Sequence, residues 1–270
     1  MINKIFNKSL SVNLNKIALV RNSREGCNPN IITHAKVCIE NGADGITVHP
    51  RPDLRHATPK DVSDLSALIS ALKKSNTNRI ELNIEGNPFT LKGGKYPGFM
   101  ELVLPLQPDQ CTLVPDTISQ LTSDHGFNLE NSSDKLYPII RRLKSNGIRV
   151  SLFMDPDIHQ IKLASELGVE RIELFTGPYA ASWGTSNSEK IFKQYLISAQ
   201  AAQGLGLGVN AGHDLNLENL SKFSSIPELQ EFSIGHALIV DALSMGLAKA
   251  VRSYKSIIAG KGQVTSVPKK

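Results

Sequence analysis

The sequence is poor in cysteine and aromatic residues and lacks long apolar runs. Its three cysteines, Cys27, Cys38 and Cys111, are scattered without CxxC spacing, which argues against a structural zinc site and for a reducing compartment. No stretch approaches the roughly 18–20 consecutive apolar residues of a membrane-spanning helix. Residues 1–8 also lack the apolar core of a signal peptide. We therefore expect a cytoplasmic protein without membrane segments.

Basic runs interleaved with aromatic residues are also absent, although the formal net charge is +5. Nucleic-acid binding is therefore not expected. A small positive excess suits anionic small substrates, but it equally suits an ordinary protein surface, so charge alone does not choose between these interpretations.

Strand-like and helix-like segments alternate along the whole chain. Short β-branched runs predict strands, and proline, threonine and glycine at segment ends predict helix boundaries. The expected strands are residues 12–14, 45–48, 79–84, 110–114, 149–154, 171–175, 208–210 and 231–234. The expected helices are residues 29–41, 58–74, 99–106, 133–146, 156–167, 188–203, 217–224 and 237–258.

This alternation predicts parallel strands joined by crossover helices. The 270 residues fit one (β/α)8 TIM barrel, with residues 1–10 and 260–270 as flexible ends. An open doubly wound sheet is the alternative. It is disfavoured because reactive side chains follow nearly every strand, whereas an open sheet gathers them at one switch point.

Reactive side chains stand at the predicted carboxyl ends of the strands. In a barrel these ends meet at one mouth, and histidines with glutamates there can transfer protons near neutral pH. A single histidine considered alone is more often structural, so the prediction rests on the convergence. The strand-end residues are Asn13, Asn15, Lys16, His49, Arg51, Glu85, Asp155, Glu173, His213, Gly235 and His236.

Metal and nucleophile motifs are not evident in the sequence. It contains no HxH or HExxH pattern and no nucleophile elbow for a Ser/His/Asp triad. A metal held by residues from different strands remains an open alternative.

Phosphate binding is better supported. The segment 233–237, SIGHA, combines a strand end, a glycine and the start of a long helix, which is a common arrangement for anion binding. Segment 209–213, VNAGH, has similarly small residues, although such glycines also permit tight turns. A second cationic set consists of Arg24, Arg51, Arg55 and His56. Two anion sites imply two phosphorylated substrates or one that is doubly phosphorylated.

Six segments taken together resemble the pyridoxine 5′-phosphate synthase family. They are VNLNKIALVRNSR at 12–24, GADGITVHPRPDLRH at 42–56, VSLF at 150–153, IELFTGPYA at 172–180, VNAGH at 209–213 and IGHA at 234–237. The resemblance runs in order from about residue 11 to 258, and the 42–56 and 209–213 segments are its most specific parts.

The resemblance implies a (β/α)8 barrel that forms homo-oligomers, commonly octamers. It implies condensation of 1-deoxy-D-xylulose 5-phosphate with 3-amino-2-oxopropyl phosphate to give pyridoxine 5′-phosphate, phosphate and water, with no metal or organic cofactor. His49 and Glu85 would be general bases, His213 the general acid, and Glu173 would stabilise charged intermediates.

The resemblance also implies contacts to each substrate. Asn13, Arg24, Gly235 and His236 would hold the aminoketone phosphate. Arg51, His56 and Thr122 would hold the pentulose phosphate. Thr122 lies on a long loop, residues 116–131, that is a candidate lid excluding water from an imine.

Three features depart from the family pattern. Asn15 and Lys16 replace an Asp-His pair found in many relatives, and Asp214 replaces a glycine, so these three substrate-binding positions differ in chemistry. The loop at 86–97 also looks longer than usual. A different phosphate-handling barrel enzyme and a non-catalytic phosphate binder therefore remain alternatives. The first lacks an evident Schiff-base lysine other than Lys16.

Overall fold

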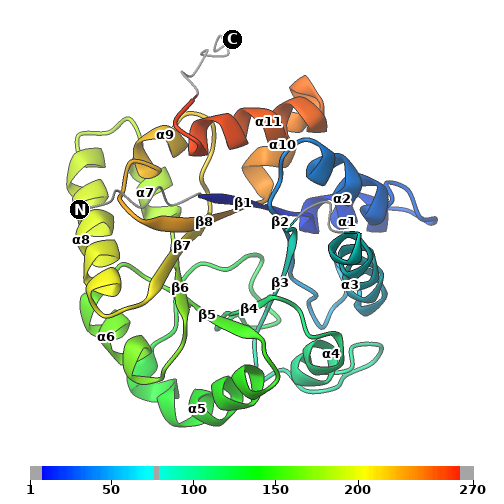
Figure 1. Cartoon of the computed structure of the whole chain (residues 1–270), viewed down its shortest axis with the longest axis horizontal. Coiled ribbons are helices and arrows are strands. Elements are labelled where there is room, and N and C mark those ends of the chain that lie inside the picture. The colour runs from blue at the N-terminus through cyan, green and yellow to red at the C-terminus, as the bar shows by residue number, and fades with distance from the viewer. Residues whose placement is uncertain (1–7, 76–78, 262–270) are drawn as a thin grey trace.

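The computed structural model describes residues 8–75 and 79–261. Eight parallel strands close into a barrel in sequence order, and the helices form a ring outside it (Figure 1). This confirms the predicted (β/α)8 barrel. The strands are β1 (Ser9–Asn13), β2 (Gly45–Val48), β3 (Glu81–Gly86), β4 (Gln110–Leu113), β5 (Arg149–Met154), β6 (Arg171–Phe175), β7 (Gly208–His213) and β8 (Leu229–Ile234).

The helices differ from the predictions in number and in some of their bounds. Helices α1 and α7 were not predicted, and the predicted helix at 237–258 is divided into α10 and α11 at Gly246, whose φ is 82°. The helices are α1 (Asn15–Asn22), α2 (Ile31–Glu40), α3 (Pro59–Lys74), α4 (Phe99–Leu106), α5 (Leu129–Ser145), α6 (Ile158–Glu166), α7 (Gly177–Ser182), α8 (Ser188–Gly204), α9 (Leu220–Phe223), α10 (His236–Met245) and α11 (Leu247–Ile258).

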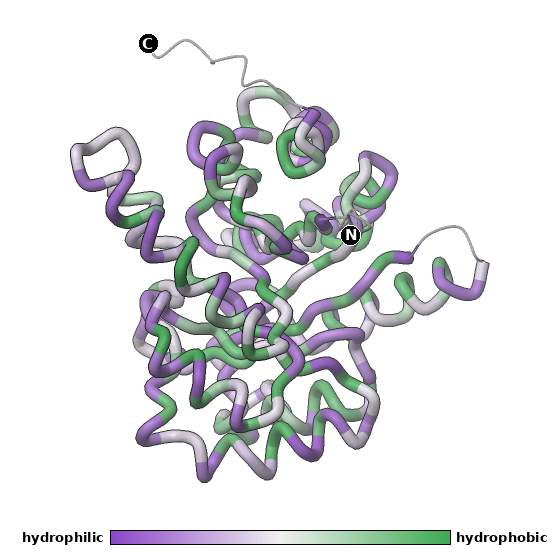
Figure 2. The backbone as a smooth tube through the Cα atoms, turned by 60° about the vertical axis from the view of Figure 1, so that its left-hand side comes forward, coloured by the Kyte–Doolittle hydropathy of each residue, from purple (hydrophilic) through white to green (hydrophobic). Residues whose placement is uncertain are grey.

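Residues 9 and 10 of the predicted flexible N-terminal end belong to β1 and pair with β8, so that part of the prediction was wrong. Residues 1–7 and 262–270 lie outside the described residues. Within the described part of the chain, no helix is both long and apolar enough to cross a membrane. Figure 2 shows hydrophobic and hydrophilic positions interspersed along the backbone.

Helix α3 begins where its sequence predicts. The Thr58 side chain accepts from Asp61 N, the Asp61 carboxylate accepts from Thr58 N, and Pro59 occupies the first turn. The Asp61 carboxylate also receives two hydrogen bonds from Arg21 of α1, at 2.5 and 2.8 Å. The capped end of α3 is thereby tied to the helix that follows β1.

Helix α5 begins four residues earlier than predicted. Its cap is Asn128, whose side chain accepts from Glu130 N at 3.1 Å, and Leu129 N donates to Gln160 Oε1 at 2.7 Å. The contact with Gln160 is tertiary, so the local sequence does not reveal it. The candidate lid is therefore shorter than residues 116–131, because residues 129–131 are helical. We call residues 114–128 the β4–α5 loop.

Apolar strand residues form the core between the barrel and the helices, while much of the barrel interior is polar. Leu10, Val12, Ile46 and Ile84 are fully buried in this core. The interior carries a linked set of buried hydroxyl and amide groups, comprising Ser11, Thr47, Asn83, Thr112 and Ser233. Each of these buried polar side chains has a hydrogen-bond partner, which offsets its desolvation.

Candidate active site

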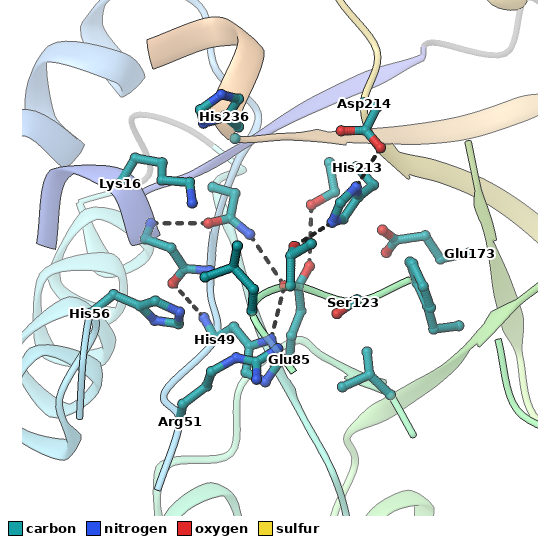
Figure 3. A pocket seen from close by; sticks show the side chains of 18 residues that line it. Lys16, His49, Arg51, His56, Glu85, Ser123, Glu173, His213, Asp214 and His236 are labelled. Atoms are coloured by element: carbon teal, nitrogen blue, oxygen red, sulfur yellow. Dashed lines mark hydrogen bonds and ion pairs between the residues drawn. The ribbon is translucent and has the colours of Figure 1, made fainter. Parts of the chain in front are cut away.

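A cavity of about 300 Å³ lies at the carboxyl ends of the strands. Of the residues that the family resemblance implicates in the site, all except Arg24 line it (Figure 3). These residues are Asn13, Asn15, Lys16, His49, Arg51, His56, Glu85, Thr122, Glu173, His213, Asp214, Gly235 and His236. With Phe153 of β5, which also lines the cavity, all eight strands or the loops directly after them contribute, as expected for parallel strands whose ends meet.

Glu85, the next-to-last residue of β3, lies at the centre of a small hydrogen-bonded cluster. Asn13 Nδ2 donates to Glu85 Oε2 at 3.2 Å, and Ser233 Oγ donates to Oε1 at 3.4 Å. His49 Nδ1 lies 3.9 Å from Oε2. Asn15 Oδ1 accepts from the backbone N–H of His49 at 2.8 Å, which fixes the chain directly after β2.

The carboxyl group of Glu85 has a pKa near neutrality, which suits proton transfer. Burial raises its pKa from 4.5 to about 7, against the opposing influence of His213. Glu173 on β6 has a pKa raised well above 4.5, first by burial and then by the charges of Glu85 and Glu231. Near neutral pH, Glu85 can therefore both release and accept a proton, and burial favours the protonated form of Glu173.

The two histidines after β2 are neutral at pH 7. Burial lowers the pKa of His49 well below 6.5, with further lowering by Arg51, His56 and Arg55. Burial and the same two arginines lower the pKa of His56 to about 4. The His49 and His56 rings meet edge to face, with centroids 6.1 Å apart. A neutral imidazole has a lone pair, so His49 is available as a base.

His213, the last residue of β7, faces the cavity from the other side (Figure 3). Its Nε2 lies 2.7 Å from Thr122 Oγ1, and its Nδ1 lies 2.7 Å from Asp214 Oδ2. Its ring packs edge to face on Phe175, with centroids 5.3 Å apart. The imidazole thus has a carboxylate on one nitrogen and a hydroxyl on the other.

Cationic side chains gather on the opposite wall, where Figure 3 shows Lys16 and Arg51 together with the neutral ring of His56. Burial lowers the pKa of Lys16, and the nearby charges of Arg55 and Arg51 lower it further. Such mutual repulsion between cations is relieved when an anion binds among them. This wall therefore suits a phosphate group.

The second predicted anion site lies at Gly235 and the start of α10. Gly235 is the residue before the helix, and a Cβ there would lie 3.1 Å from the Asn13 Cβ. Glycine therefore allows close packing against β1 and leaves the first N–H groups of α10 available to an anion.

Arginines hold the β4–α5 loop over the cavity. Arg51 forms a buried ion pair with Asp116 and donates to the carbonyls of Thr117 and Gln120, at 3.3 and 3.0 Å. Arg55 donates to the carbonyls of Gln120 and Leu121, both at 2.7 Å. These arginines, predicted as phosphate ligands, therefore also bind the loop that carries Thr122.

Three predicted residues, Arg24, Arg55 and Asp155, do not line the cavity. Arg24 is exposed in the segment after α1 and does not line the cavity. Asp155 accepts a hydrogen bond from Gly126 N at 3.1 Å and so holds the β4–α5 loop, but it does not line the cavity either. Single-sequence reasoning places a residue near a strand end and does not determine the direction of its side chain.

Five lining residues were not predicted: Val114, Leu121, Ser123, Phe153 and Ser233. Ser233 lay within the predicted phosphate segment, and Phe153 lay at the end of a predicted strand. Their apolar or small side chains give no chemical sign of function. Among residues 8–75 and 79–261, no three His, Cys, Asp or Glu side chains converge as ligands of one metal ion.

Comparison with known proteins assigns the family. Residues 10–260 match the family model described as Pyridoxal phosphate biosynthesis protein PdxJ. The chain belongs to this family. It is 48% identical over 252 residues to pyridoxine 5′-phosphate synthase of Xanthomonas campestris pv. campestris (strain B100), covering 93% of this chain and 96% of that protein. It is 47% identical over 251 residues to the protein of the same name from Albidiferax ferrireducens, covering 93% and 97%. This family membership confirms the resemblance found in the sequence.

Solved structures outside the family share the barrel. Thiamine phosphate pyrophosphorylase from Pyrococcus furiosus matches with a TM-score of 0.58 at 10% identity, covering 94% of this chain and 96% of that one. 3-Hexulose-6-phosphate synthase from Salmonella typhimurium matches with a TM-score of 0.58 at 14% identity, covering 94% and 100%. At such low identity the likeness concerns the fold alone.

Proposed function

We propose that this protein is a pyridoxine 5′-phosphate synthase that condenses 1-deoxy-D-xylulose 5-phosphate with 3-amino-2-oxopropyl phosphate. The products are pyridoxine 5′-phosphate, inorganic phosphate and water. The observation that carries the proposal is nearly full-length similarity to proteins of that name, with the proposed acid and base residues all lining one cavity.

In this proposal the two phosphates bind at two different parts of the cavity. The pentulose phosphate lies against Arg51, His56, Lys16 and Thr122, and the aminoketone phosphate lies at Gly235. The cationic wall and the start of α10 are separate anion-binding elements, which suits two phosphorylated substrates. Asn13, Asn15 and His236 complete the proposed contacts.

The proposed chemistry begins when the amine of one substrate attacks the ketone of the other. His213 protonates the departing oxygen, so that water leaves and an imine forms. His49 or Glu85 then removes a carbon proton to give an enamine, from which phosphate is eliminated. Water adds, the ring closes, and a final dehydration makes it aromatic. A neutral His49 and a Glu85 with a pKa of about 7 suit repeated proton transfer at neutral pH.

The β4–α5 loop acts as a lid in this scheme. An imine hydrolyses readily, so water has to be excluded while it persists. The ion pair between Arg51 and Asp116 and the Arg55 contacts hold the loop near the cavity. A phosphate that engages Arg51 would compete with the loop for the guanidinium, which would couple substrate binding to loop position.

We also propose that the protein is cytoplasmic and self-associates, as an octamer by family resemblance. Arg24 is exposed and does not line the cavity of the chain to which it belongs. Its predicted contact with a phosphate therefore requires either that its loop moves or that Arg24 reaches the cavity of a neighbouring protomer. Light scattering on the purified protein tests the assembly. A monomer under assay conditions, with full activity, would contradict self-association as a requirement.

The activity is tested by mixing purified protein with both phosphates and following pyridoxine 5′-phosphate by its ultraviolet absorbance, with a chelator present. Product is expected, and its formation should be lost in Glu85→Gln but retained in Glu130→Gln, which alters an exposed carboxylate on α5. Binding of each substrate without product would contradict the proposal and favour a non-catalytic phosphate binder.

A further inference from the structure

The backbone at His213 adopts a conformation that residues with a side chain rarely take. Its φ is 98°, in the left-handed region, which costs a non-glycine residue about 1–3 kcal/mol. Contacts with Thr176, the residue directly after β6, hold the chain there, because Thr176 Oγ1 donates to Gly212 O at 2.6 Å and accepts from Asp214 N at 3.4 Å. The structure thus maintains an unfavourable backbone angle at the residue that presents its imidazole to the cavity.

One consequence is that the side chains of two successive residues meet. Asp214 Oδ2 lies 2.7 Å from His213 Nδ1 (Figure 3), although neighbouring side chains on a regular strand point to opposite faces. The Asp214 backbone N–H, in turn, faces Thr176. Neither the carboxylate nor the backbone N–H of Asp214 is therefore directed at a phosphate, which argues against the direct substrate contact predicted for this residue.

The carboxylate determines which imidazole nitrogen carries the proton. Burial alone would raise the pKa of Asp214, but the hydrogen bond and charge of His213, with a smaller effect of His236, hold it below its usual value. Asp214 is therefore ionised at neutral pH and can only accept a hydrogen bond. Nδ1 must then carry hydrogen, and Nε2 is left facing Thr122 Oγ1 and the cavity.

Other titratable groups face His213 from across the cavity. Glu85 on β3 and His49 after β2 interact with it electrostatically. Both lie on the cavity side, as does the Thr122 hydroxyl on Nε2, whereas Asp214 approaches from the opposite nitrogen. The two nitrogens are thereby given different roles by the groups around them.

We propose that Asp214 is a positioning residue whose carboxylate fixes the Nδ1–H tautomer and ring orientation of His213, so that Nε2 exchanges the proton with the substrate. This inference rests on the proposed function, in which His213 is the general acid. In the acid step the doubly protonated ring gives its Nε2 proton to the departing hydroxyl oxygen, which leaves as water, and the ring that remains is neutral and keeps its Nδ1–H hydrogen-bonded to the carboxylate.

The test combines nuclear magnetic resonance with steady-state kinetics on the full chain. Protein labelled with 15N-histidine is compared with Asp214→Asn and Asp214→Gly, and the His213 signals are identified by their loss in His213→Gln. Glu130→Gln is the matched control, because Glu130 pairs with His159 at 3.0 Å on the surface, outside the cavity. Thermal unfolding checks that each variant is folded.

In the unaltered protein we expect neutral His213 to carry its hydrogen on Nδ1. Both Asp214 variants should show a mixture of tautomers and a kcat lower by about 10²-fold, with the KM for each phosphate changed less than about threefold. The control should change neither the His213 signals nor kcat.

Two results would overturn the inference. One is a spectrum of the unaltered protein with the hydrogen on Nε2, which does not depend on any variant folding. The other is a lower KM with unchanged kcat in Asp214→Asn, which would mean that the carboxylate only repels a phosphate. If the unaltered protein forms no product, the proposed function is wrong, while the tautomer measurement still decides whether Asp214 orients His213.

Discussion

The buried carboxyl group of Glu85 destabilises the folded protein at neutral and alkaline pH. Its side chain is 12% exposed, and its pKa is raised from 4.5 to about 7. A shift of that size corresponds to about 3 kcal/mol between the two protonation states. The hydrogen bonds from Asn13 and Ser233, at 3.2 and 3.4 Å, contribute only about 1 kcal/mol each, so desolvation dominates.

The direction of the pH dependence follows from proton binding. Between about pH 4.5 and 7 the folded state binds the Glu85 proton more tightly than the unfolded chain, so stability falls as pH rises through this range. Glutamine has the same shape and never ionises. We therefore expect Glu85→Gln to gain up to about 3 kcal/mol over the unaltered protein between pH 5 and pH 8.5. Turnover should fall by about 10²–10⁴-fold, because the base is lost.

The measurement is urea denaturation of both proteins at several pH values from 5 to 8.5, with the slope checked for two-state behaviour. Glu130→Gln serves as the control, because its carboxylate is exposed and its stability difference should be nearly independent of pH. A stability difference for Glu85→Gln that stays constant over this range would refute the argument that Glu85 carries a buried, costly charge.

Three further substitutions test the fold and the site. In Gly212→Ala the new Cβ would overlap the Glu173 carboxylate. We therefore expect the free energy of unfolding, measured by urea denaturation, to fall by about 1–3 kcal/mol and turnover to be lost. An unchanged free energy of unfolding would contradict this packing. Asp61→Ala removes the paired hydrogen bonds from Arg21 and the capping box of α3. The free energy of unfolding, again measured by urea denaturation, should fall by about 2–4 kcal/mol. A smaller decrease would contradict a stabilising role for the Arg21–Asp61 ion pair. Lys16→Met should raise the KM for the pentulose phosphate about tenfold in steady-state kinetics, since it removes one cation from the phosphate wall; a fall in kcat alone would instead make this lysine catalytic.

Local chemistry explains which elements were predictable. Strands β2, β5 and β6 begin and end at the predicted residues, because each is a short apolar run bounded by turn residues. Helix α3 carries its own capping box, so its start could be predicted from residues 58–61. In these elements the interactions that set the boundary lie within a few residues of it.

Elsewhere the boundaries depend on distant contacts. Helix α1 follows β1 after a single residue, so no turn residues separate them, and its Arg21 is held by Asp61 on α3. The predicted helix at 237–258 is divided at Gly246 because the φ of this residue is 82°, which is not helical. The sequence did not predict this break, because a glycine inside a helical pattern lowers helix stability by only about 1 kcal/mol. The first error involves a contact between distant residues, Arg21 and Asp61, and the second a backbone angle that the local sequence does not reveal.

The sequence by itself determined the barrel, the family and the set of side chains at the strand ends, because alternation of strands and helices brings those ends to one mouth. The tertiary structure alone decided how these side chains act. Burial sets the raised pKa of Glu85 and the lowered pKa of His49. An unusual backbone angle turns Asp214 onto His213, and Arg24 lies outside the cavity. The physical reason is that desolvation, side-chain direction and charge repulsion depend on neighbours from many strands, which spacing along one chain does not specify.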